Sequence, residues 1–168
     1  MLALLFYVKD VMYTVKCDQI REIAPMVHLK EVPHSPPFFA GYFNFRGRII
    51  PVIDLTQLIA GEPCRIRLST RIILADYPSR KRDGHILGLM AERVTETFRK
   101  PEDAFVPPSI RSRTDPYLGG IVMDEGRMIQ YLELPRLPDC IDFLPEPEDD
   151  AEAEADDGGD DGDDPDGD

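Results

Sequence analysis

The sequence predicts a mainly β protein made of two small five-stranded barrels with short helices. The first observation is an internal repeat, because Gly41–Leu58 recurs 79 positions later as Gly120–Leu137, with Gly-Arg at the same place in both copies. The second is a series of short runs rich in branched residues and separated by Gly and Pro, which is typical of small barrels. Two copies are too few for a solenoid. We therefore expect two similar lobes related by a pseudo-two-fold axis.

Six runs carry the strand pattern along the chain. The first two, Leu2–Val8 and Val11–Cys17, are separated by Lys9-Asp10 and predict a hairpin. The later runs are dominated by branched residues: Ile49–Leu55, Arg71–Ala75, His85–Ala91 and Met128–Leu132. Since each lobe has only about 70 residues, close to the lower limit for a stable core, the lobes are expected to pack on each other.

Turn and helix signals lie between these runs. Arg46-Gly47 and Glu125-Gly126 stand where each repeat turns back, and glycine there allows the positive φ of a tight hairpin. Pro51 inside its run predicts an edge or bulged strand. We expect a turn over Phe38–Tyr42 and one short helix over Leu55–Ala60, ended by Gly61.

The charge divides the chain into a folded body and a tail. Residues 145–168 hold 14 of the 32 acidic residues and no Lys or Arg, which leaves 18 acidic against 19 basic residues in the body. A segment of Asp, Glu, Gly, Ala and Pro cannot bury enough apolar surface to offset its ordering entropy. The predicted organisation is a body over 1–144, with lobes at roughly 1–66 and 67–144 or with their terminal strands exchanged, and a disordered acidic tail over 145–168.

No catalytic or metal-binding pattern is present in the sequence, so we expect no enzymatic activity, cofactor or metal. The three histidines, His28, His34 and His85, have no catalytic neighbours. Arg65 next to Cys64 would favour a reactive thiol, but no histidine is near to activate it. Cys17, Cys64 and Cys140 fit a reducing compartment. The apolar start, Met1–Val8, is too short to be a signal peptide or to span a membrane, which predicts a cytoplasmic protein.

One alternative function rests on the aromatic and basic residues of the first repeat. Tyr42 to Arg48 interleaves aromatic side chains with arginines, as single-strand nucleic-acid platforms do, and a barrel of OB type would provide the scaffold. Against this, the body is almost neutral, and an acidic tail repels phosphate. Alternating aromatic residues in a hairpin strand also usually belong to the core.

The same segment supports a resemblance to a known family. Asn44–Leu55, led by Gly41 and preceded by Val32-Pro33, resembles the signature of CheW-like domains, the coupling proteins of bacterial chemosensory arrays. The family form is Asn-Leu-Arg-Gly followed by a hydrophobic run into Asp-Leu. Three further segments are similar to family segments: Asp18–Ile23, Ile86–Val94 and Tyr117–Ile121. The resemblance covers roughly Leu2–Leu137.

The resemblance implies two SH3-like barrels around a shared hydrophobic seam and a noncatalytic adaptor. Such proteins bridge the cytoplasmic tip of a methyl-accepting receptor to a histidine kinase of the CheA type, whose regulatory domain has the same fold. By motif position, the receptor-binding groove would contain Ile20, Glu22, Arg46 and Val94. Phe45 replaces the usual Leu and Ala91-Glu92 replaces Val-Asp, which indicates a divergent member, as in an alternative chemosensory pathway.

Overall fold

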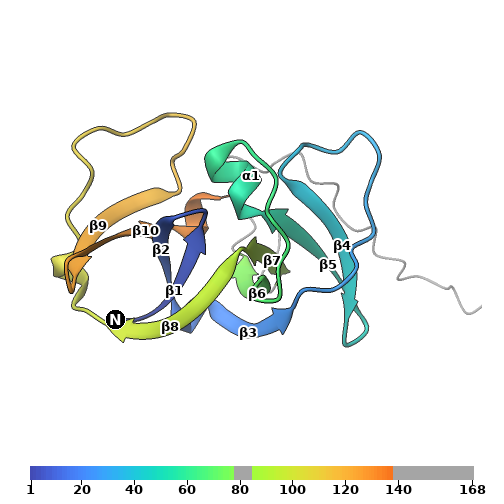
Figure 1. Cartoon of the computed structure of the whole chain (residues 1–168), viewed down its shortest axis with the longest axis horizontal. Coiled ribbons are helices and arrows are strands. Elements are labelled where there is room, and N and C mark those ends of the chain that lie inside the picture. The colour runs from blue at the N-terminus through green and yellow to red at the C-terminus, as the bar shows by residue number, and fades with distance from the viewer. Residues whose placement is uncertain (78–84, 138–168) are drawn as a thin grey trace, which may run out of the picture.

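The computed structural model describes residues 1–77 and 85–137 and contains two five-stranded sheets (Figure 1). The first sheet has the order β8-β1-β2-β10-β9, with β1 at Leu2–Val8, β2 at Val11–Lys16, β8 at Arg93–Arg99, β9 at Leu118–Asp124 and β10 at Arg127–Leu132. The second has the order β3-β6-β7-β5-β4, with β3 at Ile20–Pro25, β4 at Phe39–Phe45, β5 at Arg48–Asp54, β6 at Arg71–Tyr77 and β7 at His85–Ala91. The predicted mainly β fold is confirmed.

Helical structure is short in the described residues. Helix α1 spans Leu55–Ala60, and single 3-10 turns occupy Cys17–Gln19 (η1), Glu102–Ala104 (η2) and Leu134–Arg136 (η3). Asp54 caps α1, since its carboxylate accepts from the Gln57 N–H at 3.1 Å, and Gly61 ends the helix at φ 71°. The predicted helix is therefore confirmed.

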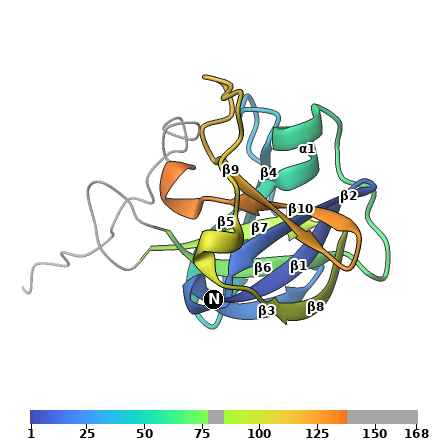
Figure 2. The ribbon, with the colours of Figure 1, turned by 90° about the vertical axis from the view of Figure 1, so that its left-hand side faces the viewer.

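The two sheets are related by the internal repeat. Exchanging each strand for its repeat counterpart, β1 for β6, β2 for β7, β3 for β8, β4 for β9 and β5 for β10, converts one sheet order into the other. In each sheet a hairpin from one half of the chain pairs in parallel with the last strand of the other half. These ladders are β2 with β10 and β5 with β7. Figure 2 shows β10 crossing beside β1 and β2, although they come from opposite ends of the chain.

In this topology each sheet contains one hairpin from the other half of the chain. The hairpin β1-β2 belongs with β8, β9 and β10, and the hairpin β6-β7 belongs with β3, β4 and β5. Parallel strands cannot be joined by a tight turn and need a crossover. The chain meets this requirement by passing each hairpin to the opposite sheet. Residues 138–168, including the acidic tail and Cys140, lie outside the described residues.

Two local expectations are wrong. Phe38–Tyr42 forms a turn only at its start, where the Phe39 N–H bonds the Pro36 carbonyl at 3.0 Å, and β4 begins at Phe39. For Pro51 the edge position is wrong, because β5 is an interior strand between β7 and β4, although the β4-β5 ladder has a register shift at Val52 and Ile53, next to the proline. It is tolerated there because the ladder with β7 begins one residue later, at Val52, so the proline removes no donor from that ladder.

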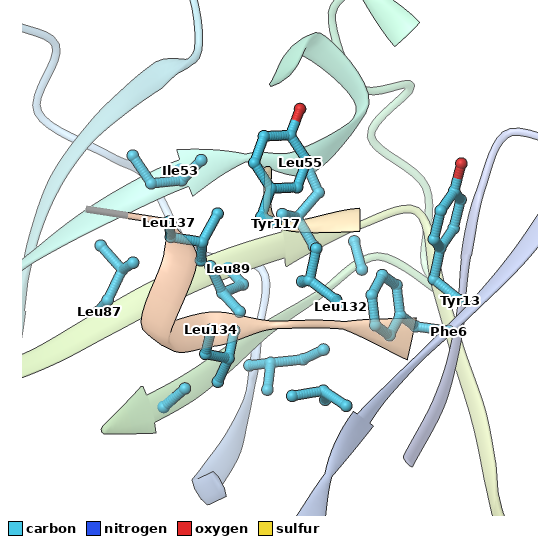
Figure 3. Packing of buried hydrophobic residues seen from close by; sticks show 14 of the residues in the cluster. Phe6, Tyr13, Ile53, Leu55, Leu87, Leu89, Tyr117, Leu132, Leu134 and Leu137 are labelled. Atoms are coloured by element: carbon cyan, nitrogen blue, oxygen red, sulfur yellow. The ribbon is translucent and has the colours of Figure 1, made fainter. Parts of the chain in front are cut away.

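The largest hydrophobic core lies between the sheets. Phe6 and Val15 from the first sheet pack with Ile53 and Leu89 from the second in one cluster of 17 buried residues, and Leu132, Leu134 and Leu137 extend it (Figure 3). The clusters that involve only one sheet each are smaller, with eight and four buried residues. We call the large cluster the seam. Most of the stabilising burial is therefore common to both lobes.

We expect the two lobes to unfold in one transition, because neither can keep the seam buried without the other. Urea unfolding followed by far-ultraviolet circular dichroism should coincide with unfolding followed by tyrosine fluorescence, since the chain has no Trp. Tyr13 and Tyr117 in the seam report on the contact between lobes. Two separated transitions would contradict a shared core.

Candidate protein-binding surface

Two apolar side chains from different sheets meet the same core at its edge. Ile20 begins β3 and pairs with Ala75, whereas Val94 lies near the start of β8 and pairs with Phe6. Both are partly buried and pack against the seam. Strands β3 and β8 are edge strands that run along the same side of the molecule in Figures 1 and 2. The seam thus reaches the surface between β3 and β8, and the outer edge of each of these strands is unpaired among the described strands.

A charged pair lies on the same strand as Ile20. The Glu22 carboxylate is 3.1 Å from the Arg46 guanidinium, and the guanidinium also lies 4.8 Å from the centre of the Phe45 ring. The Arg46 side chain is 74% exposed. An exposed pair of this kind contributes only about 0–1 kcal/mol to folding. The Arg46 guanidinium therefore lies over the Phe45 ring and still has most of its surface accessible to a binding partner.

The backbone of Arg46 adds a reason to regard its side chain as functional. Arg46 has a φ of 51° and Gly47 a φ of 82°, and the Gly47 N–H donates to the Asn44 side chain at 2.9 Å. A left-handed φ costs a residue with a Cβ roughly 1–2 kcal/mol, so Gly or Asn would suit the turn better. The repeat places Glu125 in the same conformation, at φ 46°. The turn therefore requires neither charge, and the sign at each position is free to serve binding.

The four residues derived from the motif fall into two groups. Glu22 forms an ion pair with Arg46, whereas Ile20 and Val94 both pack against the seam. The sequence reasoning missed the corresponding pair on the other lobe, where Glu96 on β8 lies 3.2 Å from Arg127 of the β9-β10 hairpin. The internal repeat could have indicated Glu96, because Glu96 is the counterpart of Glu22 at an offset of 74 residues.

Catalytic and nucleic-acid chemistry gain no support from the geometry. Within residues 1–77 and 85–137 no group of His, Cys, Asp and Glu could hold a metal ion. Phe43 is buried and Phe45 packs against the core of the second sheet, so these rings are not free to stack on bases. No helix in the described part of the chain has the length and apolar character to cross a membrane.

The thiol of Cys64 is held in its neutral form. Burial, together with the nearby carboxylates of Asp54 and Glu92, raises the pKa of Cys64 to about 12. Its backbone N–H donates to the Asp54 carboxylate at 2.9 Å, which fixes the thiol close to that charge. The adjacent Arg65 does not offset these effects. Cys64 is consequently a poor nucleophile.

We expect Cys64 to react slowly with iodoacetamide, because only the thiolate is nucleophilic. At pH 8 its alkylation should be at least about tenfold slower than in the urea-unfolded chain, and the rate should keep rising beyond pH 9, since the pKa lies near 12. Peptide mapping would separate Cys64 from the other cysteines. A native-state rate that levels off below pH 9 would contradict the raised pKa.

Comparison with known proteins agrees with this geometry. The model of the CheW-like domain family matches residues 2–140. The chain belongs to the CheW-like domain family. The match covers nearly all of the described fold, including both sheets and the edge strands β3 and β8.

Relatives and a solved structure give the same result. The chain is 28% identical to a probable chemotaxis protein CheW of Rhizobium etli over 79% of this chain and 83% of that protein. It is 26% identical to protein FrzA of Myxococcus xanthus over 72% of this chain and 73% of that protein. The crystal structure of the scaffolding protein TtCheW from Thermoanaerobacter tengcongensis superposes with a TM-score of 0.71 at 26% identity, covering 79% of this chain and 84% of that one.

These matches establish the general function of the protein. The protein is a noncatalytic CheW-like scaffold of chemotaxis signalling, and its two five-stranded sheets are the SH3-like barrels expected of the family.

Proposed function

We propose that the protein couples the cytoplasmic tip of a methyl-accepting receptor to the regulatory domain of a CheA-type histidine kinase. The observation that carries the proposal is the placement of Ile20 and Val94 on two adjacent edge strands, where the seam reaches the surface. A helical tip could bury its apolar face there while Glu22 and Arg46 fix its orientation. This role implies a cytoplasmic location, which we include in the proposal.

We also propose that the pathway is an alternative, non-flagellar one. The support is the departure from the family form at Phe45 and at Ala91-Glu92, next to the residues assigned to the receptor. Phe45 carries the ring beneath Arg46, so this departure changes the surroundings of the proposed contact. Isolation of the native complex and identification of its kinase would test this point; a kinase of a flagellar pathway would contradict it.

The direct test of coupling is titration of the full chain with a receptor-tip fragment and, separately, with the kinase regulatory domain. We expect binding to each and a ternary complex when all three are mixed. Competition of the receptor fragment with the kinase domain for one surface would contradict a bridging role. Salt-dependent binding of a single-stranded oligonucleotide, with no binding to the receptor fragment, would favour the nucleic-acid alternative.

Arg46→Glu should lower receptor affinity by about fivefold, or about 1 kcal/mol, because it places two carboxylates side by side at the proposed rim. The turn tolerates the change, since Glu125 has the same left-handed backbone in the other lobe. The matched control is the reciprocal change Glu125→Arg, which should leave receptor binding unaltered. Equal loss in both variants, measured by calorimetric titration, would exclude a specific role for Arg46.

A further inference from the structure

A cationic cavity lies beside the Val94 end of the proposed receptor surface, since Glu92 and Arg93 line it. It has a volume of about 350 Å³ and is lined by the β1-β2 turn, the loop between α1 and β6, and the start of β8. Its basic lining is Lys9, Arg65, Arg67 and Arg93, and its acidic lining is Asp10 and Glu92. With Glu62, which pairs with Lys9, counted as well, the cavity has an excess of one positive charge, which favours an anionic occupant. In Figure 2 the loop from α1 to β6 can be followed past the end of β2.

Three of the basic groups form no ion pair within the described part of the fold, although Lys9 and, to a lesser extent, Arg65 lower the pKa of the Glu62 carboxylate. Lys9 is paired with Glu62 at 2.6 Å, but the guanidinium groups of Arg65, Arg67 and Arg93 form no ion pair with a carboxylate of residues 1–77 or 85–137. Arg93 instead lies over the Tyr7 ring, 3.8 Å from its centre. Stacking on a ring leaves the N–H edge of a guanidinium free to bind a carboxylate.

The loop that carries two of these arginines is held in place by a buried side chain. The Thr70 hydroxyl is fully buried, accepts from the Arg67 N–H at 2.8 Å and donates to the Arg65 carbonyl at 3.4 Å. The Ser69 hydroxyl donates to the Glu92 carbonyl at 3.2 Å, which ties the loop to the start of β8. The arginines are therefore presented by an ordered backbone, so less conformational entropy is lost when they bind an anion.

We propose that this cavity binds the chain's own acidic segment, residues 145–168. That segment supplies 14 carboxylates and no basic group, whereas the body has a nearly balanced charge, so the segment and the cavity are complementary. Carboxylates of successive Asp and Glu residues can form charge-assisted hydrogen bonds with several guanidinium groups at once.

The covalent connection favours this occupant over a free anion. Asp156 lies 19 positions after Leu137 in the chain. An extended chain of that length spans about 60 Å, several times the radius of gyration of roughly 14 Å for a body of this size. The segment can therefore reach the cavity, and its covalent connection to the body gives it an effective concentration in the millimolar range. A contact of this kind weakens as salt shortens the Debye length.

The test uses nuclear magnetic resonance of the ¹⁵N-labelled full chain at about 20 mM and about 500 mM NaCl, salt levels at which the Debye length differs severalfold. The probes are the backbone amides of Gly158, Gly159 and Gly162 in the acidic segment. In the wild-type chain these signals should move toward random-coil positions when salt is raised. The double variant Arg65→Ala/Arg67→Ala should show the high-salt positions already at low salt.

A matched control separates specific docking from general attraction. Arg111 and Arg113 have the same spacing as Arg65 and Arg67 and are also exposed, but neither lines this cavity. Arg111→Ala/Arg113→Ala should retain the wild-type salt response. The proposal is overturned if both double variants behave alike, if neither differs from wild type, or if the response depends on protein concentration, which would indicate docking on a second copy. Amide dispersion of the body checks the fold of each variant.

Discussion

Leu132→Ala is expected to lower the free energy of unfolding by about 3 kcal/mol, within the range of about 2–5 kcal/mol for deleting a buried leucine. Leu132 is fully buried in β10 and belongs to the seam, where it lies among Phe6, Tyr117 and Leu134 (Figure 3). The seam receives residues from both sheets, so the cavity left by the change cannot be confined to one lobe. The measurement is urea unfolding of the variant and the wild type.

The destabilisation should be shared by both lobes. Hydrogen exchange at Ile129 in the first sheet and at Ile73 in the second should lose protection by the same factor, since the global opening of the whole fold exposes both. Leu68→Ala is the matched control because Leu68 is 98% exposed, and its effect should stay within about 0.5 kcal/mol. Loss of protection at Ile129 alone would show that the lobes open independently.

The sequence predicts six of the ten strands in the described residues, because these six contribute apolar residues both to the seam and to the smaller clusters. The other four, β3, β4, β8 and β9, have charged residues or glycines within them, as in Arg93–Arg99 and Leu118–Asp124. Strand β8, at Arg93–Arg99, is an edge strand stabilised by pairing with β1, some 90 residues away along the chain. No local pattern reports a partner at that distance.

The exchange of hairpins between sheets is also beyond what the repeat can reveal. A repeat predicts that β1-β2 and β6-β7 play equivalent roles, and both the exchanged and the contiguous arrangements satisfy that equivalence. The two arrangements differ in the parallel pairs that they form. In this fold β2 pairs with β10 and β7 pairs with β5. Likewise, the motif supplies Glu22 and Arg46 as separate residues, and only the fold shows that they form a pair.

Ile20→Asp is expected to weaken receptor binding by about 2 kcal/mol or more, roughly thirtyfold, because it places an unpaired charge at the centre of the proposed contact. Ile20 is partly buried and packs on the seam together with Val94. The kinase regulatory domain is expected to bind as before, since the proposed receptor surface is formed by β3 and β8 at one side of the molecule. Titration of the folded variant against each partner is the measurement.

The control for Ile20→Asp is the same type of change at an exposed apolar residue outside the proposed surface. Met123 lies in β9, at the opposite edge of the first sheet from β8, and is 54% exposed, so Met123→Asp should leave receptor affinity within about twofold of wild type. Because Ile20 contacts the seam, circular dichroism must first show that the variant is folded; if it is not, Ile20→Ala, which removes apolar area without adding charge, should still weaken receptor binding severalfold. An equal loss of affinity for receptor and kinase in a folded variant would remove Ile20 from the receptor contact, because a residue confined to one partner's surface can affect only that partner.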